Sequence, residues 1–219
     1  MRASSSRDLF RIAGVLAIAA AVLSVWVAIE EAPMPGDLRI AREIQSWGRL
    51  ADNEWLINGA HPWRFAALAL AAGLTLFSKR LGGSPGAKGD VRDYALWAFI
   101  ATAVLSFLDN LLKVLIRSPR PLADLGVRVE EVRNTYGFPS GHVYGDVLVY
   151  GVLAVTAPVW VHPRLVVPVR AVCLAVIVLS GPARVVVGAH WPSDALGGYL
   201  WGGAALAFSI GFARWMTGR

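Results

Sequence analysis

The chain has 219 residues, of which 56% are hydrophobic and only 16% are charged. One soluble core of this size does not bury so much apolar surface, so the composition indicates a protein of the lipid bilayer. The formal net charge of +6 would suit a nucleic-acid binder, but the lysines and arginines gather at the chain ends and in alternate loops. This distribution is typical of membrane proteins and argues against nucleic acid as a partner.

Six apolar segments approach the length of about 20 residues that a membrane-spanning helix needs. They cover residues 9–29, 57–78, 94–112, 143–160, 165–183 and 193–213. We therefore expect one all-α integral membrane domain over residues 1–219, with six transmembrane helices. The first segment follows Arg2, Arg7 and Arg11 as a secretory signal would. Its length and its poor cleavage site predict a retained anchor instead.

Loop charges predict how the domain sits in the cell membrane. Lysines and arginines are frequent at both termini and in the loops 79–93 and 161–168, which places these parts in the cytoplasm. The loop 31–56 then lies outside. Within it, Asp37 precedes apolar residues at helical spacing, which predicts a short amphipathic helix. That helix lies on the outer interface or packs as an ordinary loop helix.

Ionisable residues gather where the third to sixth helices reach the outer face. They form three blocks: Lys113-x6-Arg120-Pro121, Pro139-Ser140-Gly141-His142 and Arg184-x5-His190-x3-Asp194. Such groups are costly near hydrocarbon, so they indicate a functional site, with ion pairing between helices as the alternative.

The residue types suit phosphoryl transfer. A transferring phosphoryl group spreads negative charge over its oxygens, and Lys113, Arg120 and Arg184 supply positive charge. Ser140 is expected to cap the helix that starts at Gly141, where the small residue leaves room for an oxyanion and lets backbone amides face it.

His190 and Asp194 stand one helical turn apart, and Pro192 suits the first turn of the sixth helix. The carboxylate can therefore reach one imidazole nitrogen and fix the tautomer, which leaves the other nitrogen to attack phosphorus.

The three ordered blocks strongly resemble the type 2 phosphatidic acid phosphatase superfamily, which includes lipid phosphate phosphatases and vanadium haloperoxidases. The resemblance spans about residues 95–210. It implies that His190 is the nucleophile of a phosphohistidine mechanism and that Asp194 orients it. His142 is then the general acid for the leaving oxygen. One position departs from the family pattern, because Ala183 stands where a serine usually precedes the arginine; this affects phosphate affinity or substrate preference.

The resemblance implies hydrolysis of a lipid phosphate or diphosphate among the membrane lipids. The Gly-Phe-Pro-Ser-Gly-His and His-Trp-Pro-Ser-Asp versions of the blocks look like bacterial enzymes that recycle the cell-wall carrier, which favours undecaprenyl diphosphate. Phosphatidic acid and phosphatidylglycerol phosphate are alternative substrates. A lipid phosphotransferase and a non-catalytic lipid-phosphate binder or transporter are alternative functions. A short, membrane-embedded chain disfavours a haloperoxidase.

We expect no metal or cofactor. His142, His190, Asp194 and Asp146 could form a ligand set, but the three cations already supply what Mg²⁺ gives a phosphate and would repel a metal ion.

Four further features have two interpretations each. Asp109 either pairs with Lys113 or packs between helices, and Asp146 either orients His142 or packs. Arg117 either joins the phosphate cluster or sits among lipid headgroups. The loop 122–138 either selects the headgroup or is an inert connector.

Overall fold

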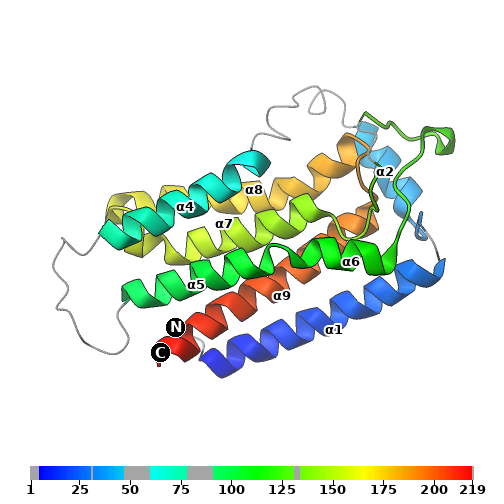
Figure 1. Cartoon of the computed structure of the whole chain (residues 1–219). Coiled ribbons are helices and arrows are strands. Elements are labelled where there is room, and N and C mark those ends of the chain that lie inside the picture. The colour runs from blue at the N-terminus through cyan, green and yellow to red at the C-terminus, as the bar shows by residue number, and fades with distance from the viewer. Residues whose placement is uncertain (1–4, 31, 47–59, 78–90, 131–133, 219) are drawn as a thin grey trace.

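The computed structural model describes residues 5–30, 32–46, 60–77, 91–130 and 134–218, and in these ranges the regular elements are helices (Figure 1). They are α1 (Ser6–Glu30), α2 (Asp37–Ser46), α4 (Ala60–Phe77), α5 (Val91–Leu105), α6 (Leu108–Ile116), η3 (Ala123–Leu125), α7 (Gly141–Trp160), η4 (Pro163–Leu165), α8 (Val166–Val186) and α9 (Pro192–Thr217).

The long helices form an elongated bundle of membrane-spanning length. Five stretches are long and apolar enough to cross a bilayer: α1, α5 with α6, α7, η4 with α8, and α9. The shorter apolar helix α4 corresponds to the expected segment 57–78, of which residues 57–59 and 78 lie outside the described ranges. The all-α membrane fold is therefore confirmed. Both termini lie at one end of the bundle, and α2 lies at the other (Figure 1).

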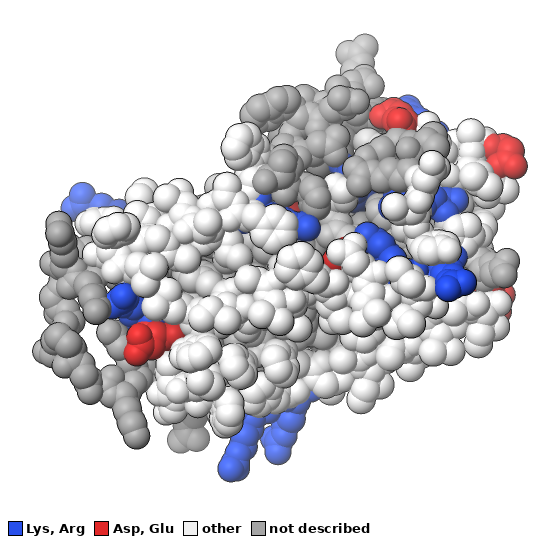
Figure 2. Space-filling view, viewed as in Figure 1, with Lys and Arg blue, Asp and Glu red and all other residues white. Residues whose placement is uncertain are grey.

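The helix α7 is the central one, because it packs against α4, α8 and α9 and buries most of its side chains. Apart from His142 and Asp146 near its start, its sequence is largely apolar on all sides, as expected for a helix surrounded by other helices. In contrast, α1 and α8 expose many large apolar side chains, which suits helices that face lipid. Figure 2 shows a largely uncharged surface, with charged side chains mainly toward the two ends.

Two glycines bring α9 against the start of α7. A Cβ atom on Gly198 would lie 2.8 Å from Ser140 O, and one on Gly202 would lie 2.8 Å from Tyr144 O. Small residues four apart allow such a close helix crossing in membranes. The crossing brings the second and third sequence blocks together, and Ser140 N donates a hydrogen bond to Asp194 O at 2.9 Å.

The third expected helix, 94–112, is longer than predicted and is interrupted. It begins at Val91 and ends at Ile116, with a break between Leu105 and Leu108. A break in the membrane leaves backbone groups that need partners. Tyr144 Oη donates to Leu105 O at 2.6 Å and so satisfies one of them.

The predicted helix in the first external loop is α2, which packs against α8 and α9. The structure therefore supports a packed loop helix. Asp37 is its first residue, and the carboxylate accepts hydrogen bonds from Met34, which precedes α2, and from Ser193 of α9. The rest of the loop, residues 47–56, lies outside the described ranges.

Candidate functional site

The three sequence blocks meet at the end of the bundle that carries α2. The third block turns sharply between α8 and α9, where Gly188 has a φ of +68°. A side chain at Gly188 would also collide with the Arg128 backbone. Within this turn, Ala189 N and His190 N both donate to Arg184 O, at 3.1 Å and 3.3 Å. The tight turn therefore fixes the backbone of His190 relative to Arg184.

His190 and Asp194 form a buried pair, with 2% and 0% of their side chains exposed. Asp194 Oδ2 lies 3.3 Å from His190 Nδ1 and accepts a hydrogen bond from Trp191 N at 3.0 Å. Trp191 is the N-cap of α9, and Asp194 is its third helical residue. Asp194 Oδ2 therefore contacts both the N-cap amide of α9 and the imidazole of His190. An acid at the third position of a helix can bind the N-cap N–H in this way, and its contact with the imidazole orients the ring.

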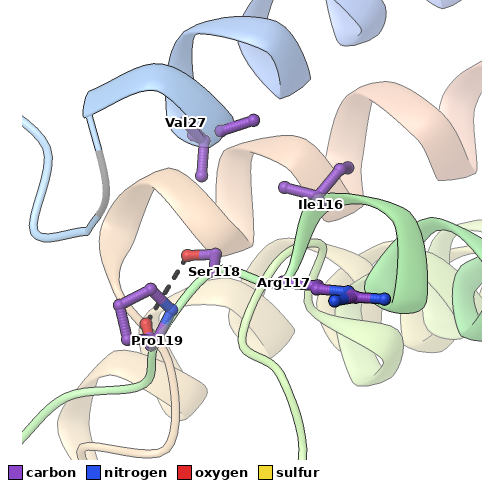
Figure 3. Close-up of a pocket in the computed structure, with 6 residues that line it drawn as sticks. Val27, Ile116, Arg117, Ser118 and Pro119 are labelled. Carbon is purple, nitrogen blue, oxygen red and sulfur yellow. Dashed lines mark hydrogen bonds between the residues drawn. The ribbon is translucent and has the colours of Figure 1, made fainter.

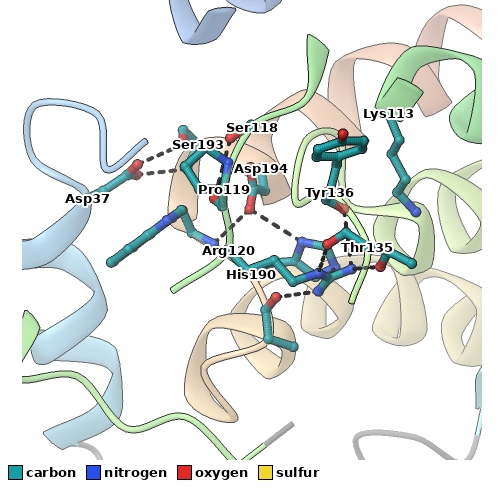
Figure 4. Close-up of polar contacts among 12 residues, drawn as sticks. Asp37, Lys113, Ser118, Pro119, Arg120, Thr135, Tyr136, His190, Ser193 and Asp194 are labelled. Atoms are coloured by element: carbon teal, nitrogen blue, oxygen red, sulfur yellow. Dashed lines mark hydrogen bonds and ion pairs between the residues drawn. The ribbon is translucent and has the colours of Figure 1, made fainter. Parts of the chain in front are cut away.

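Arg120 lies on the other side of the imidazole. Its Nη1 donates to Ala189 O at 2.6 Å and lies 3.3 Å from His190 Nε2. Its Nε donates to Thr135 O at 2.7 Å, so the guanidinium connects the segment after α6 to the loop before α7 (Figure 4).

The contacts with Asp194 and Arg120 indicate which nitrogen of His190 carries the hydrogen. A guanidinium has only donors, so Nε2 facing Arg120 is the unprotonated nitrogen. Nδ1 then carries the hydrogen toward Asp194 Oδ2, 3.3 Å away. The free lone pair of an unprotonated imidazole nitrogen is what nucleophilic attack requires.

Lys113 and Asp109 form an ion pair on α6, with Lys113 Nζ 3.3 Å from Asp109 Oδ2. The pair lies against the start of α7, because a Cβ atom on Gly141 would be 2.7 Å from Lys113 Nζ and would also contact Asp109 Oδ2. The space on the Cβ side of Gly141, where we expected room for an oxyanion, is thus filled by the side chains of the ion pair. Of the two interpretations of Asp109, the structure supports pairing with Lys113.

The second block begins α7, with Ser140 at the N-cap position. The predicted side-chain cap is wrong: Ser140 makes no side-chain cap hydrogen bond, and its buried Oγ has no hydrogen-bond partner among the described residues. The backbone N–H of Ser140 donates to Asp194 O. His142 follows in the first turn of α7 and is 8% exposed.

Arg184 and Asp146 occupy the buried side of the site. Arg184, in the last turn of α8, is 1% exposed. Asp146 accepts a hydrogen bond from Ser180 Oγ at 2.7 Å and lies within electrostatic reach of Arg64 and Arg184. This bond joins α7 to α8, and the orientation of His142 by Asp146 stays a prediction.

Arg117 turns away from this cluster. It adopts a left-handed φ of 56° at the end of α6, and its Nε donates back to Val114 O at 3.1 Å. It lines a cavity of about 330 Å³ beside the end of α1, together with Val27 and Ile116 (Figure 3). Its proposed membership of the phosphate cluster gains no support from these contacts.

Sequence reasoning missed one buried cation, Arg64 on α4. It is 8% exposed, and its Nη1 donates to Gly141 O at 3.3 Å. It lies in electrostatic reach of Asp109 and Asp146. The available signal was an arginine inside an apolar segment, which marks a functional position in membrane helices.

Within the loop 122–138, residues up to Glu130 contact the helix bundle. Glu130 N donates to Val187 O at 3.0 Å, and Arg128 and Glu130 form an exposed ion pair at 3.4 Å. Residues 131–133 lie outside the described ranges. The loop therefore borders the turn that carries His190.

Comparison with family models matches residues 94–217 to the PAP2 superfamily. The chain belongs to this superfamily. The match spans α5 to α9 and includes all three blocks, so the PAP2 resemblance of the sequence is confirmed. The fold is also shared with a solved structure, described as the first transmembrane PAP2-type phosphatidylglycerolphosphate phosphatase from Bacillus subtilis. The two chains are 21% identical, with a TM-score of 0.68, over 92% of this chain and 95% of that one. Comparison with curated proteins returned no match.

Proposed function

We propose that this PAP2 protein is an integral membrane phosphatase that hydrolyses a lipid phosphate or diphosphate through a phosphohistidine on His190. The observation that carries the proposal is the position of His190 between Asp194 on Nδ1 and Arg120 beside Nε2. This arrangement prepares an imidazole for attack and places positive charge where the phosphate must bind.

In the first step, His190 Nε2 attacks phosphorus while the bond from phosphorus to the lipid-side oxygen breaks. His142 donates a proton to that leaving oxygen. Arg120, which faces Nε2 at 3.3 Å, exchanges this contact for the incoming phosphate. Lys113, Arg120 and Arg184 balance the charge of the transferring group.

In the second step, water attacks the phosphohistidine and the nitrogen–phosphorus bond breaks. The deprotonated His142 takes the proton of the water, so both histidines return to their starting states. Asp194 stabilises the positive charge that His190 carries while it is phosphorylated. Ser140 Oγ, buried without a hydrogen-bond partner among the described residues, and the amide of Gly141 are further donors for the phosphate.

The proposal includes independence from metal ions. Lys113, Arg120 and Arg184 supply the charge neutralisation that Mg²⁺ gives in other phosphoryl-transfer sites. Turnover that persists in EDTA is the expected result.

We favour a polyprenyl diphosphate as the substrate, on the resemblance of the second and third blocks to bacterial wall-carrier enzymes. The structural similarity to a phosphatidylglycerolphosphate phosphatase makes that lipid the second candidate. The loop 122–138 and Ala183 are proposed to influence the choice of headgroup, because both adjoin segments that carry site residues.

We propose that the site faces the exterior of the cytoplasmic membrane. The termini share the opposite end of the bundle from α2 (Figure 1), and the arginines near them favour the cytoplasm. Labelling of single introduced cysteines in intact cells tests this orientation.

The decisive experiment measures phosphate release by the purified protein from a panel of lipid phosphates, with and without EDTA. His190→Ala is the test variant, and His162→Ala is the matched control because His162 is exposed and lies between α7 and α8. Loss of turnover only in His190→Ala supports the proposal. Undiminished turnover in that variant contradicts the nucleophile, and loss in EDTA contradicts metal independence.

The same panel separates the alternatives. Product formation that requires an added lipid acceptor indicates a phosphotransferase. A binder or transporter predicts lipid-phosphate binding without phosphate release and no dependence on His190.

A further inference from the structure

The carboxylate of Asp37, at the start of α2, is buried against the start of α9. Its side chain accepts hydrogen bonds from Ser193 N at 2.9 Å, Ser193 Oγ at 2.7 Å and Met34 N at 2.8 Å. Asp37 is 3% exposed. Ser193 directly precedes Asp194, so this acid contacts the turn that orients His190 (Figure 4).

Two carboxylates share the N-terminal turn of α9. The first backbone N–H groups of a helix lack partners within it. Asp194 accepts from Trp191 N, and Asp37 accepts from Ser193 N, which lies 156 residues away in sequence. Asp37 thus satisfies Ser193 N, while Asp194 Oδ2 serves both Trp191 N and the imidazole of His190.

The C-terminal end of α2 contacts the segment that precedes the His190 turn. Gln45 Nε2 donates to Val185 O and to Arg128 O, both at 3.0 Å. Gln45 Oε1 accepts from Arg128 N at 2.8 Å. Val185 follows Arg184, so the two ends of α2 hold the segments that enter and leave the His190 turn.

We propose that Asp37 is a positioning residue for phosphoryl transfer. Through Ser193 it holds the first turn of α9, so that Asp194 keeps His190 Nε2 aimed at phosphorus. This rests on the proposed function of His190. Asp37 lies outside residues 94–217, which match the superfamily model, and the support thus comes from a part of the chain beyond that match.

A positioning role affects the rate of the chemical step and leaves phosphate binding nearly intact. We therefore expect Asp37→Asn to lower kcat about 10- to 100-fold, since small displacements of a reacting group have effects of this order. KM for the lipid phosphate and inhibition by inorganic phosphate should change less than about two-fold, because Lys113, Arg120 and Arg184 remain. Asp93→Asn, an exposed acid at the start of α5, is the matched control and should retain the kcat of the unaltered protein.

A second pair of variants covers the case in which Asp37→Asn does not fold. Ser193→Ala removes the hydroxyl that donates to Asp37 at 2.7 Å, whereas Ser193→Thr keeps a hydroxyl. We expect alanine to lower kcat more than threonine does. Equal kcat values for these two variants would overturn the proposal.

A double variant tests whether Asp37 acts through Asp194. Once Asp194→Asn has disturbed the imidazole, adding Asp37→Asn should lower kcat little further. The proposal would be overturned if the two substitutions lowered kcat independently, so that their fold-losses multiplied in the double variant. It would also be overturned if Asp37→Asn left kcat unchanged, or if it weakened inhibition by inorganic phosphate as much as it lowered kcat. Failure of the proposed function is distinguishable, because His190→Ala would then retain turnover whatever Asp37→Asn does.

Discussion

The part of the chain before residue 78 and the part after residue 90 contribute differently to the site. The later part, which contains the PAP2 match over residues 94–217, carries all three sequence blocks. The earlier part carries none of them, yet Asp37 contacts Ser193 and Arg64 contacts Gly141 O. The later part therefore supplies the groups proposed to react, and the earlier part holds the backbone that presents them. The predictions below test this division.

The largest expected effect lies in the later part. His190→Ala should lower kcat by at least about 1,000-fold, because removing a nucleophile eliminates the covalent route. The measurement is phosphate release at saturating lipid phosphate. Neither His162→Ala nor Asp93→Asn should approach this loss. If His190→Ala lowered kcat less than Asp37→Asn does, the later part of the chain would not supply the reacting group.

Arg64 provides the strongest test of stability for the earlier part. Arg64→Gln removes the cation on α4 that lies near Asp109 and Asp146 and the donor to Gly141 O. Asp109 keeps Lys113 and Asp146 keeps Arg184 as nearby cations, so the variant weakens a buried charge network without leaving either acid uncompensated. We expect a lower midpoint of thermal unfolding in detergent. The exposed Arg39→Gln, on α2, is the control and should leave the midpoint unchanged.

A double variant identifies the partner of Arg64. Asp146→Asn removes a charge near Arg64, so Arg64→Gln with Asp146→Asn should be more stable than Arg64→Gln alone. If neutralising Asp146 gives no recovery, Arg64 does not act as its counter-charge.

The sequence predicts the features that depend on local composition. Run lengths of apolar residues indicated the spanning helices, and the four-residue spacing of His190 and Asp194 predicted their contact, which forms at 3.3 Å. The run lengths suffice for the helices, whereas the contact forms although His190 precedes α9, because Asp194 is the third residue of that helix and its carboxylate reaches back over the helix start.

Features that depend on contacts between distant segments were not predictable in this way. Asp37 meets Ser193 across 156 residues, and Arg64 meets Gly141 across 77. Ser140 N likewise meets Asp194 O, which belongs to another helix. The break after Leu105 contains neither proline nor glycine, and its partner Tyr144 comes from another helix.

A smaller effect is expected at that break. Tyr144→Phe removes the hydroxyl that donates to Leu105 O at 2.6 Å, and an unsatisfied buried carbonyl costs about 1–3 kcal/mol. The unfolding midpoint should fall by less than it does in Arg64→Gln. Tyr136→Phe is the control, because Tyr136 is 41% exposed. A loss equal to that control would show that the hydroxyl does not stabilise the break.

The smallest expected effect is a dependence of stability on pH through Asp37. Burial raises the pKa of Asp37 above its usual 3.8, although the hydrogen bonds from Ser193 oppose this. The folded state therefore holds the Asp37 proton more tightly than the unfolded state, and stability falls as the pH rises from 3.8 through the raised pKa. Asp37→Asn lacks this titration.

The unfolding midpoints of the unaltered protein and of Asp37→Asn should thus be compared at several pH values from about 4 to 7. The stabilisation of the unaltered protein over the variant should shrink as the pH rises. A difference that grows with pH would mean that the hydrogen bonds from Ser193 and Met34 outweigh burial. The earlier part of the chain would then hold α9 through a carboxylate that is stabilised in its charged form.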